Sequence, residues 1–203
     1  MYQSLMSYKD FQLEDALERF QLRLSERPLF REVAPREPSA WLAEALREGA
    51  PLALTLSNEK ARSELIIAPV LLEVRRVLLH KVSLFTGVEL DVDASQGLNG
   101  VCDWLLSRSP EQIILRAPVV AVVEAKQENI RGGLGQCVAE MVAAQRFNER
   151  AKQPVARVHG AVTTGDNWRF LSLEGDALTV DADEYLLPEI AKVLGVFLAV
   201  LAE

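Results

Sequence analysis

The chain has 203 residues, 49% hydrophobic and 25% charged, which is the composition of an ordinary globular protein. Twenty-two Lys and Arg against 29 Asp and Glu give a net charge of −7, which argues against nonspecific coating of nucleic acid. Two cysteines exclude a disulfide scaffold and favour a reducing compartment, and no apolar run approaches the roughly 20 residues of a membrane span. We therefore expect a cytoplasmic protein with no membrane contact.

The first 56 residues are expected to form a cover packed on a larger core. A short helix is predicted over 13–19, running into an extended segment. Ser39 can cap a second helix over 40–48, which Gly49 and Pro51 should end.

A long helix is predicted over 58–79, because apolar residues recur there at helical spacing. Ser57 or Asn58 can cap it, and Pro69 should kink it, since proline removes a backbone donor and clashes with the preceding turn.

Three extended runs follow this helix. Residues 88–93 alternate apolar and acidic side chains, as a half-exposed strand does, and 101–106 form a second run. Residues 119–123 are a β-branched run suited to a buried central strand. Since short turns join them, these strands should pair antiparallel.

The glycines of NIRGGLG then lead into a predicted helix over about 135–151. Two strands are expected over 157–163 and 169–173, the first of them parallel to the strand before the helix. The final helix, 187–202, is apolar on most sides, so we expect it to be packed or paired.

This order predicts an α/β fold, a mixed sheet flanked by helices, in one domain over 1–203. The core should span about 57–175, with the N-terminal cover and the C-terminal helix as additions to it.

Asp103, Glu124 and Lys126 are the residues best suited to chemistry. Glu124 and Lys126 are two apart at the end of an apolar strand, so their side chains leave the same face. Asp103 lies in the preceding strand and can align beside Glu124. A divalent cation relieves the repulsion of two such carboxylates, and Mg²⁺ typically takes one or two of them. Taken alone, a Glu-x-Lys pair is usually a solvated salt bridge.

These residues, with their context, resemble the PD-(D/E)XK nuclease superfamily, the restriction-endonuclease-like fold. The matching pieces are Asp103 in NGVCDWLL, Glu124 and Lys126 in VVAVVEAKQ, and Gln136 in LGQCVAEMVAAQ. Glu64 in KARSELIIAPVLLEV is similar to a helix acid that some members use as a further metal ligand.

The resemblance covers about 57–175 and implies an αβββαβ core. GAVTTGDNWRFLSL is similar to the strand pair after the core helix in type I restriction subunits, and the whole is similar to an uncharacterised cyanobacterial family of this fold. Cys102 stands where the proline of the family's name would be, and no strongly basic arm is present.

By this resemblance, Asp103 and Glu124 would bind Mg²⁺ or Mn²⁺, with Glu64 as a possible further ligand. Lys126 would be the catalytic lysine, and Gln136 would contact the substrate or a metal-bound water. The implied activity is metal-dependent hydrolysis of DNA phosphodiester bonds, with RNA as a further candidate substrate.

A second hypothesis is an inactive nuclease fold that serves as a dimeric binding or assembly module. Its motivation is the net charge and the apolar final helix, which could seat a second copy and form a homodimer.

Glu140 would face the carboxylates as part of a polar wall or lie on a solvated helix face, and we favour the solvated face. Glu73 is predicted at a solvated position. Trp168 would stack on a base or cap the core, and we favour the core. The basic groups around Lys60, Arg76 and Arg146 would line a phosphate-binding groove or lie on solvated helix sides.

Overall fold

The computed structural model describes residues 6–202. The helices are α1 (Leu13–Phe20), α2 (Ala40–Leu56), α3 (Glu59–Arg62), α4 (Ala68–Val77), α5 (Ile130–Arg150) and α6 (Ile190–Ala202), with a π-helical segment, Ser63–Ile67, between α3 and α4. The strands are β1 (Arg23–Arg27), β2 (Ser83–Glu89), β3 (Val101–Ser107), β4 (Val119–Ala125), β5 (Val158–Thr163), β6 (Asn167–Glu174), β7 (Ala177–Asp181) and β8 (Tyr185–Leu186).

The strands form one mixed sheet in the order β1-β7-β6-β5-β4-β3-β2, with the short β8 beside β6. β2, β3 and β4 pair antiparallel, as their short connections predict. β5 returns parallel to β4 after α5, also as predicted. β6 and β7 continue the sheet antiparallel, and β1 closes its far edge parallel to β7.

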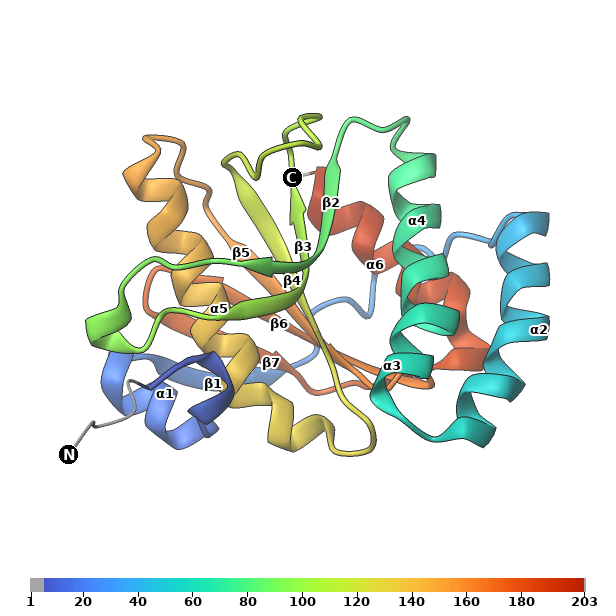
Figure 1. Ribbon diagram of the computed structural model, residues 1–203, viewed down its shortest axis with the longest axis horizontal. Helices are drawn as coiled ribbons and strands as arrows, with labels where there is room; N and C mark the ends of the chain where they lie inside the picture. Colours follow the sequence, from blue (N-terminus) through green and yellow to red (C-terminus); the bar gives the residue numbers. More distant parts are fainter. Residues whose placement is uncertain (1–5, 203) are drawn as a thin grey trace.

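Helices cover both faces of this sheet (Figure 1), which confirms the mixed α/β class. α1 and α5 lie on one face, where Ala16 and Val138 pack in the same apolar core as Val122. α2, α4 and α6 lie on the other, where Phe197 packs in the same core as Val123. Successive residues of β4 point to opposite faces, so its continuous apolar run is explained by burial on both sides.

The second helix is longer than predicted. Ser39 caps it as expected, accepting a hydrogen bond from the backbone N–H of Leu42 at 3.3 Å. The helix does not end at Gly49 and Pro51 but continues to Leu56. Gly49 is a packing residue, because a Cβ there would lie 2.7 Å from the carbonyl oxygen of Leu65.

The predicted long helix is continuous from Glu59 to Val77, and Asn58 caps it. Its irregularity is the π-helical segment Ser63–Ile67, which ends two residues before Pro69, a residue that cannot donate an i→i−4 hydrogen bond.

Other boundaries differ from the predictions. The predicted strand over 88–93 is β2, which begins at Ser83 and ends at Glu89. α5 begins at Ile130, so the glycines expected before it lie in its first turns. β7 and β8 were not predicted, and the extended segment after α1 is a strand of the sheet.

The final helix packs within the chain. α6 lies on the face of the sheet that also carries α4, and its larger apolar residues are buried there. The apolar side on which the homodimer prediction depended is therefore occupied intramolecularly. Among residues 6–202, no helix combines the length and apolar character needed to cross a membrane.

Candidate active site

The candidate site is built at the end of β4. Glu124 is the sixth residue of this strand and points to the α5 face, where its side chain is 2% exposed. Lys126 follows the strand, and its backbone N–H donates to the carbonyl of Thr163 at 2.8 Å, which extends the parallel pairing with β5. Both side chains are therefore fixed by the centre of the sheet.

Lys126 joins the strand to α5. Its Nζ donates to Glu124 Oε1 at 2.5 Å and to Gln136 Oε1 at 3.1 Å. A Cβ on Gly133 would lie 3.0 Å from Lys126 Cγ and 2.7 Å from Val162 Cγ1. The first turn of α5 therefore reaches the sheet closely enough to hold the lysine only because residue 133 is glycine.

Gln136 is in turn oriented by Glu140. The amide Nε2 of Gln136 donates to Glu140 Oε1 at 3.1 Å, and Glu140 is fully buried, 0% exposed. The prediction of a solvated Glu140 was therefore wrong. The spacing of four residues between Gln136 and Glu140 was the available signal, because it places both on one helix face.

Asp103 reaches the same place from β3. The last recorded β3–β4 pair is Trp104 with Val123, so Asp103 comes level with Glu124. Instead of a further ladder bond, the Oδ2 of Asp103 accepts a hydrogen bond from the backbone N–H of Ala125 at 2.9 Å. The carboxylate is thus anchored between Glu124 and Lys126.

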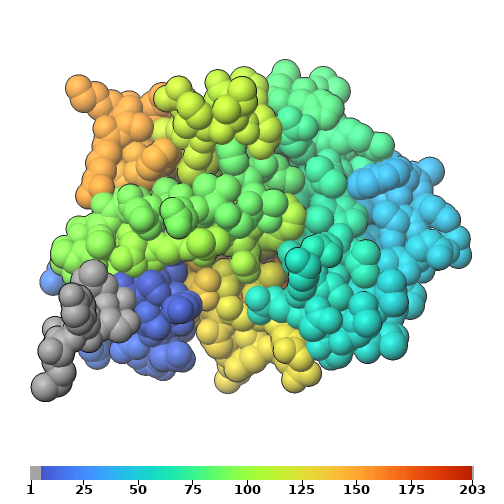
Figure 2. All heavy atoms as spheres, in the orientation of Figure 1, coloured from blue at the N-terminus to red at the C-terminus, as the bar shows by residue number. Residues whose placement is uncertain are grey.

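An open cavity of about 320 Å³ lies beside Asp103. It is lined by Glu59, Lys60, Ser63, Glu64, Ala68, Thr86, Asp103, Trp104 and Ala125. In Figure 2 the segment that carries the first of these residues (teal) and the loop leading into α5 (yellow) meet at the lower edge of the molecule.

Two helix acids line this cavity, and they differ in their surroundings. Glu64 is mostly exposed and pairs with Lys60 at 3.4 Å, so its carboxylate is largely solvated and is neutralised outside the site. Burial, partly offset by Lys126 and reinforced by Asp103, raises the pKa of Glu59. Glu59 therefore lies within electrostatic reach of the site, and sequence reasoning missed it.

The electrostatics follow from several carboxyl groups around one ammonium. Burial and then the charge of Asp103 raise the pKa of Glu124 to about 8, against the attraction of Lys126. Burial, reinforced by Glu124, raises the pKa of Glu140 well above its ordinary value. Burial by itself would lower the pKa of Lys126. The neighbouring carboxylates, Glu124 first among them, raise that pKa by more, so the net shift is upward. The site is short of positive charge.

The donor set fits a divalent cation. Glu124 Oε2 and Glu140 Oε2 are buried and have no hydrogen-bond partner in the part of the chain that the structure describes, and Asp103 adds an anchored carboxylate. Mg²⁺ is commonly bound by one or two carboxylates, with water and substrate oxygens as its other ligands. Across residues 6–202, however, no three His, Cys, Asp or Glu side chains are already gathered as a metal site.

The predicted basic groups are largely used within the fold. Arg62 is buried and pairs with Asp166 at 2.5 Å. Arg76 pairs with the buried Glu73 at 3.1 Å, so the prediction of a solvated Glu73 was also wrong. Arg146 pairs with an acid of the β2–β3 connection. These three arginines are therefore engaged by acids of the chain itself. Trp168, 0% exposed, is a core residue as predicted.

Comparison with protein-family models, with curated proteins and with solved structures finds no match for this chain. The fold and the geometry of the site therefore carry the functional argument.

Proposed function

We propose that this chain is a Mg²⁺- or Mn²⁺-dependent phosphodiesterase of the nuclease type that hydrolyses DNA. The observation that carries the proposal is the meeting of Asp103, Glu124, Lys126 and Gln136, from two neighbouring strands and one helix. Lys126 donates hydrogen bonds to Glu124 and Gln136, and Asp103 accepts one from the backbone N–H of Ala125, which lies between Glu124 and Lys126. These are the four residues that the resemblance to PD-(D/E)XK nucleases assigns to the active site.

The order of elements supports the same proposal. The helix Glu59–Val77, the antiparallel strands β2, β3 and β4, the helix α5 and the parallel strand β5 follow one another as in an αβββαβ core. α1, α2 and β1 are then N-terminal additions to that core, and α6 is a C-terminal one.

In this proposal Asp103 and Glu124 hold the cation. The bound cation supplies a Lewis acid that polarises the phosphate and acidifies a water molecule. Glu124 would contribute to holding the cation, since one oxygen of its buried carboxyl group has no hydrogen-bond partner among residues 6–202. Because that carboxyl group is buried and its pKa is raised, cation binding must be accompanied by loss of its proton.

Lys126 orients the attacking water or a phosphate oxygen by donating hydrogen bonds. Its raised pKa keeps it an ammonium ion, which favours this role over proton abstraction. Gln136 and Glu140 are positioning residues, since they contact the lysine or the glutamine that holds it.

The direct test is an assay of the purified chain on plasmid and oligonucleotide DNA with Mg²⁺ or Mn²⁺. Glu124→Gln and Lys126→Met should each lower cleavage at least about a hundredfold. Glu89→Gln and Lys81→Met are matched controls, because both residues are exposed and lie outside the site. Equal activity in Lys126→Met and Lys81→Met would remove the mechanism.

The alternative, an inactive nuclease fold used as a binding module, makes the opposite prediction. Calorimetry would then show no divalent-cation binding, and no DNA would be cut. Light scattering would show a dimer, whose interface would have to lie outside the buried face of α6.

A further inference from the structure

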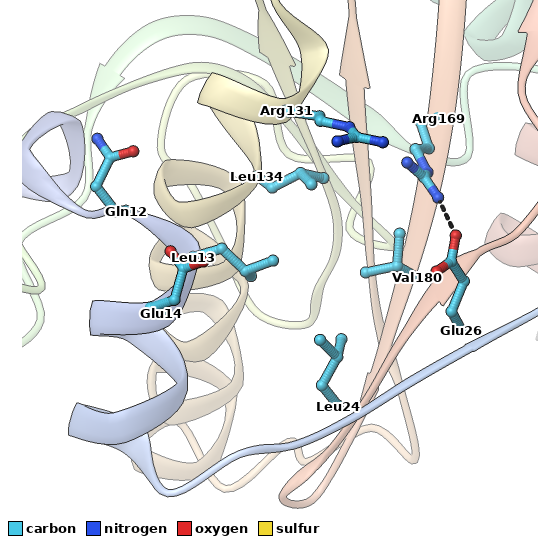
Figure 3. A pocket seen from close by; sticks show the side chains of 9 residues that line it. All are labelled: Gln12, Leu13, Glu14, Leu24, Glu26, Arg131, Leu134, Arg169 and Val180. Atoms are coloured by element: carbon cyan, nitrogen blue, oxygen red, sulfur yellow. Dashed lines mark hydrogen bonds and ion pairs between the residues drawn. The ribbon is translucent and has the colours of Figure 1, made fainter.

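A second cavity lies on the α5 face of the sheet, between α1, β1 and the first turn of α5 (Figure 3). We call it the Arg131 pocket; its volume is about 380 Å³, within the range of small-ligand sites. Its charged lining residues are Glu14, Glu26, Arg131 and Arg169.

Two arginines converge on this pocket. Arg169 is held rigidly, because its Nε donates to the carbonyl of Asp181 at 3.0 Å and a terminal nitrogen donates to Glu26 at 2.5 Å. Its side chain is only 11% exposed. In Figure 3 the guanidinium of Arg131 points toward that of Arg169. A fixed cation and a second one beside it favour an anion between them.

The charge of Arg131 is not neutralised by a neighbouring acid among the described residues. Among the residues that the structure describes, no ion pair or side-chain hydrogen bond engages its guanidinium, and it lies in the first turn of α5, where the helix dipole adds positive potential. Arg169 pairs with two carboxylates, Glu26 at 2.5 Å and Glu184 at 3.7 Å, whose side chains are 62% and 43% exposed. Because both carboxylates keep contact with solvent, an entering anion can displace Glu26 without leaving a buried, unpaired charge.

The pocket is in line with the candidate active site. Glu124 pairs with Val162 of β5, and Val162 pairs with Arg169 of β6, so the three lie in one row across the sheet. At roughly 4.8 Å between neighbouring strands, Arg169 lies about 10 Å from Glu124. Successive nucleotides of one DNA strand advance by about 3.4 Å along the helix axis, so this is a span of about three nucleotides.

The pocket also offers an apolar surface. Leu134 and Val180 are nearly fully buried at its floor, and Leu24 lies exposed at its side. The site thus combines two arginines with an aliphatic surface, which suits a phosphate carried on an organic body better than an inorganic ion.

We infer that the Arg131 pocket binds a backbone phosphate of the DNA strand, with Arg131 and Arg169 as its ligands and the attached nucleoside against the aliphatic floor. The phosphate lies a few nucleotides from the bond that is cut. The assignment of this phosphate to DNA rests on the proposed function. The anion site itself is inferred from the two arginines and the cavity alone.

The test is DNA binding measured by fluorescence anisotropy without divalent cations, so that no strand is cut. The probes are a labelled 12-nucleotide single strand and its duplex, competed by deoxynucleoside 5′-monophosphate or inorganic phosphate. Arg131→Gln should weaken DNA binding about tenfold, as loss of one charge-assisted hydrogen bond does, and should reduce the slope of log Kd against log salt concentration by about one. Arg116→Gln, an exposed arginine in the loop before β4, is the matched control.

Equal binding by Arg131→Gln and Arg116→Gln would overturn the inference, as would DNA that does not bind at all. Arg131-dependent binding of the mononucleotide without binding of DNA would overturn the DNA assignment and keep the phosphate site. Arg131-dependent DNA binding by a chain that never cuts DNA would support the pocket and refute the proposed hydrolysis. DNA cleavage at the same rate by the wild type and by Arg131→Gln would support the proposed hydrolysis and refute the pocket.

Discussion

Replacement of Glu140 by glutamine should remove part of the pH dependence of folding stability. Glu140 is fully buried, and burial raises its pKa well above its ordinary value. The folded state therefore binds more protons than the unfolded state at every pH between the unfolded pKa, about 4.3, and the folded one. Stability is fully present below the unfolded pKa and falls as pH rises toward the folded pKa.

The magnitude follows from one proton. A difference of one bound proton is worth about 1.4 kcal/mol per pH unit, so between pH 5 and pH 7 the wild type should lose up to about 2.7 kcal/mol more than Glu140→Gln. Glutamine keeps an acceptor for Gln136 but places an amide where an unpartnered oxygen now lies. That adds a cost independent of pH, so the slopes of the two curves are the quantity to compare.

Urea denaturation at half-unit steps from pH 5 to pH 8 gives both slopes. Glu89→Gln, an exposed glutamate, should give a curve parallel to that of the wild type. If the curve of Glu140→Gln is also parallel to the wild type, Glu140 does not hold a proton in the folded chain, and the account of its burial is wrong.

Three further predictions concern the site and the helices around it. Mg²⁺ affinity should rise about tenfold per pH unit up to about pH 8, because Glu124 must lose its proton to bind; calorimetry at pH 6, 7 and 8 measures this, and a constant affinity would exclude Glu124 as a ligand. Gly133→Ala should abolish most cleavage while costing about 1–3 kcal/mol of stability, because the new methyl group would displace Lys126; wild-type cleavage rates by this variant would contradict the proposed positioning. Glu73→Ala should cost about 3 kcal/mol by urea denaturation, because its buried carboxylate accepts hydrogen bonds at the start of α2; a loss below about 1 kcal/mol would show that the helix is held by apolar contacts alone.

The elements around the site could be predicted because their signals are local. The run Val119–Val123 followed by Glu-x-Lys marks a buried strand that ends in polar residues, and the pattern after it marks a helix. The antiparallel and parallel pairings then followed from the lengths of the connections. Three of the four proposed site residues, Glu124, Lys126 and Gln136, lie in these segments within about a dozen positions of one another.

The features that sequence reasoning missed depend on contacts between distant segments. Glu140 is buried because α5 is covered on one side by the sheet and on another by α1, where Gly135 lies against the backbone of Gln12. The sequence of α5 alone contains no pattern that indicates its burial by α1. β1 has the polar sequence RLSER and exposed side chains, so only its backbone pairing with β7, some 150 residues later, makes it a strand.

The central claim is that Asp103 and Glu124 form one cation site next to Lys126. A crystal of the chain soaked in Mn²⁺ tests it most directly, through the anomalous signal of the metal. One strong peak bonded to carboxylate oxygens of both acids is expected, and this peak should be lost in Glu124→Gln. A well-ordered site at high Mn²⁺ concentration with no peak between these two carboxylates would contradict it.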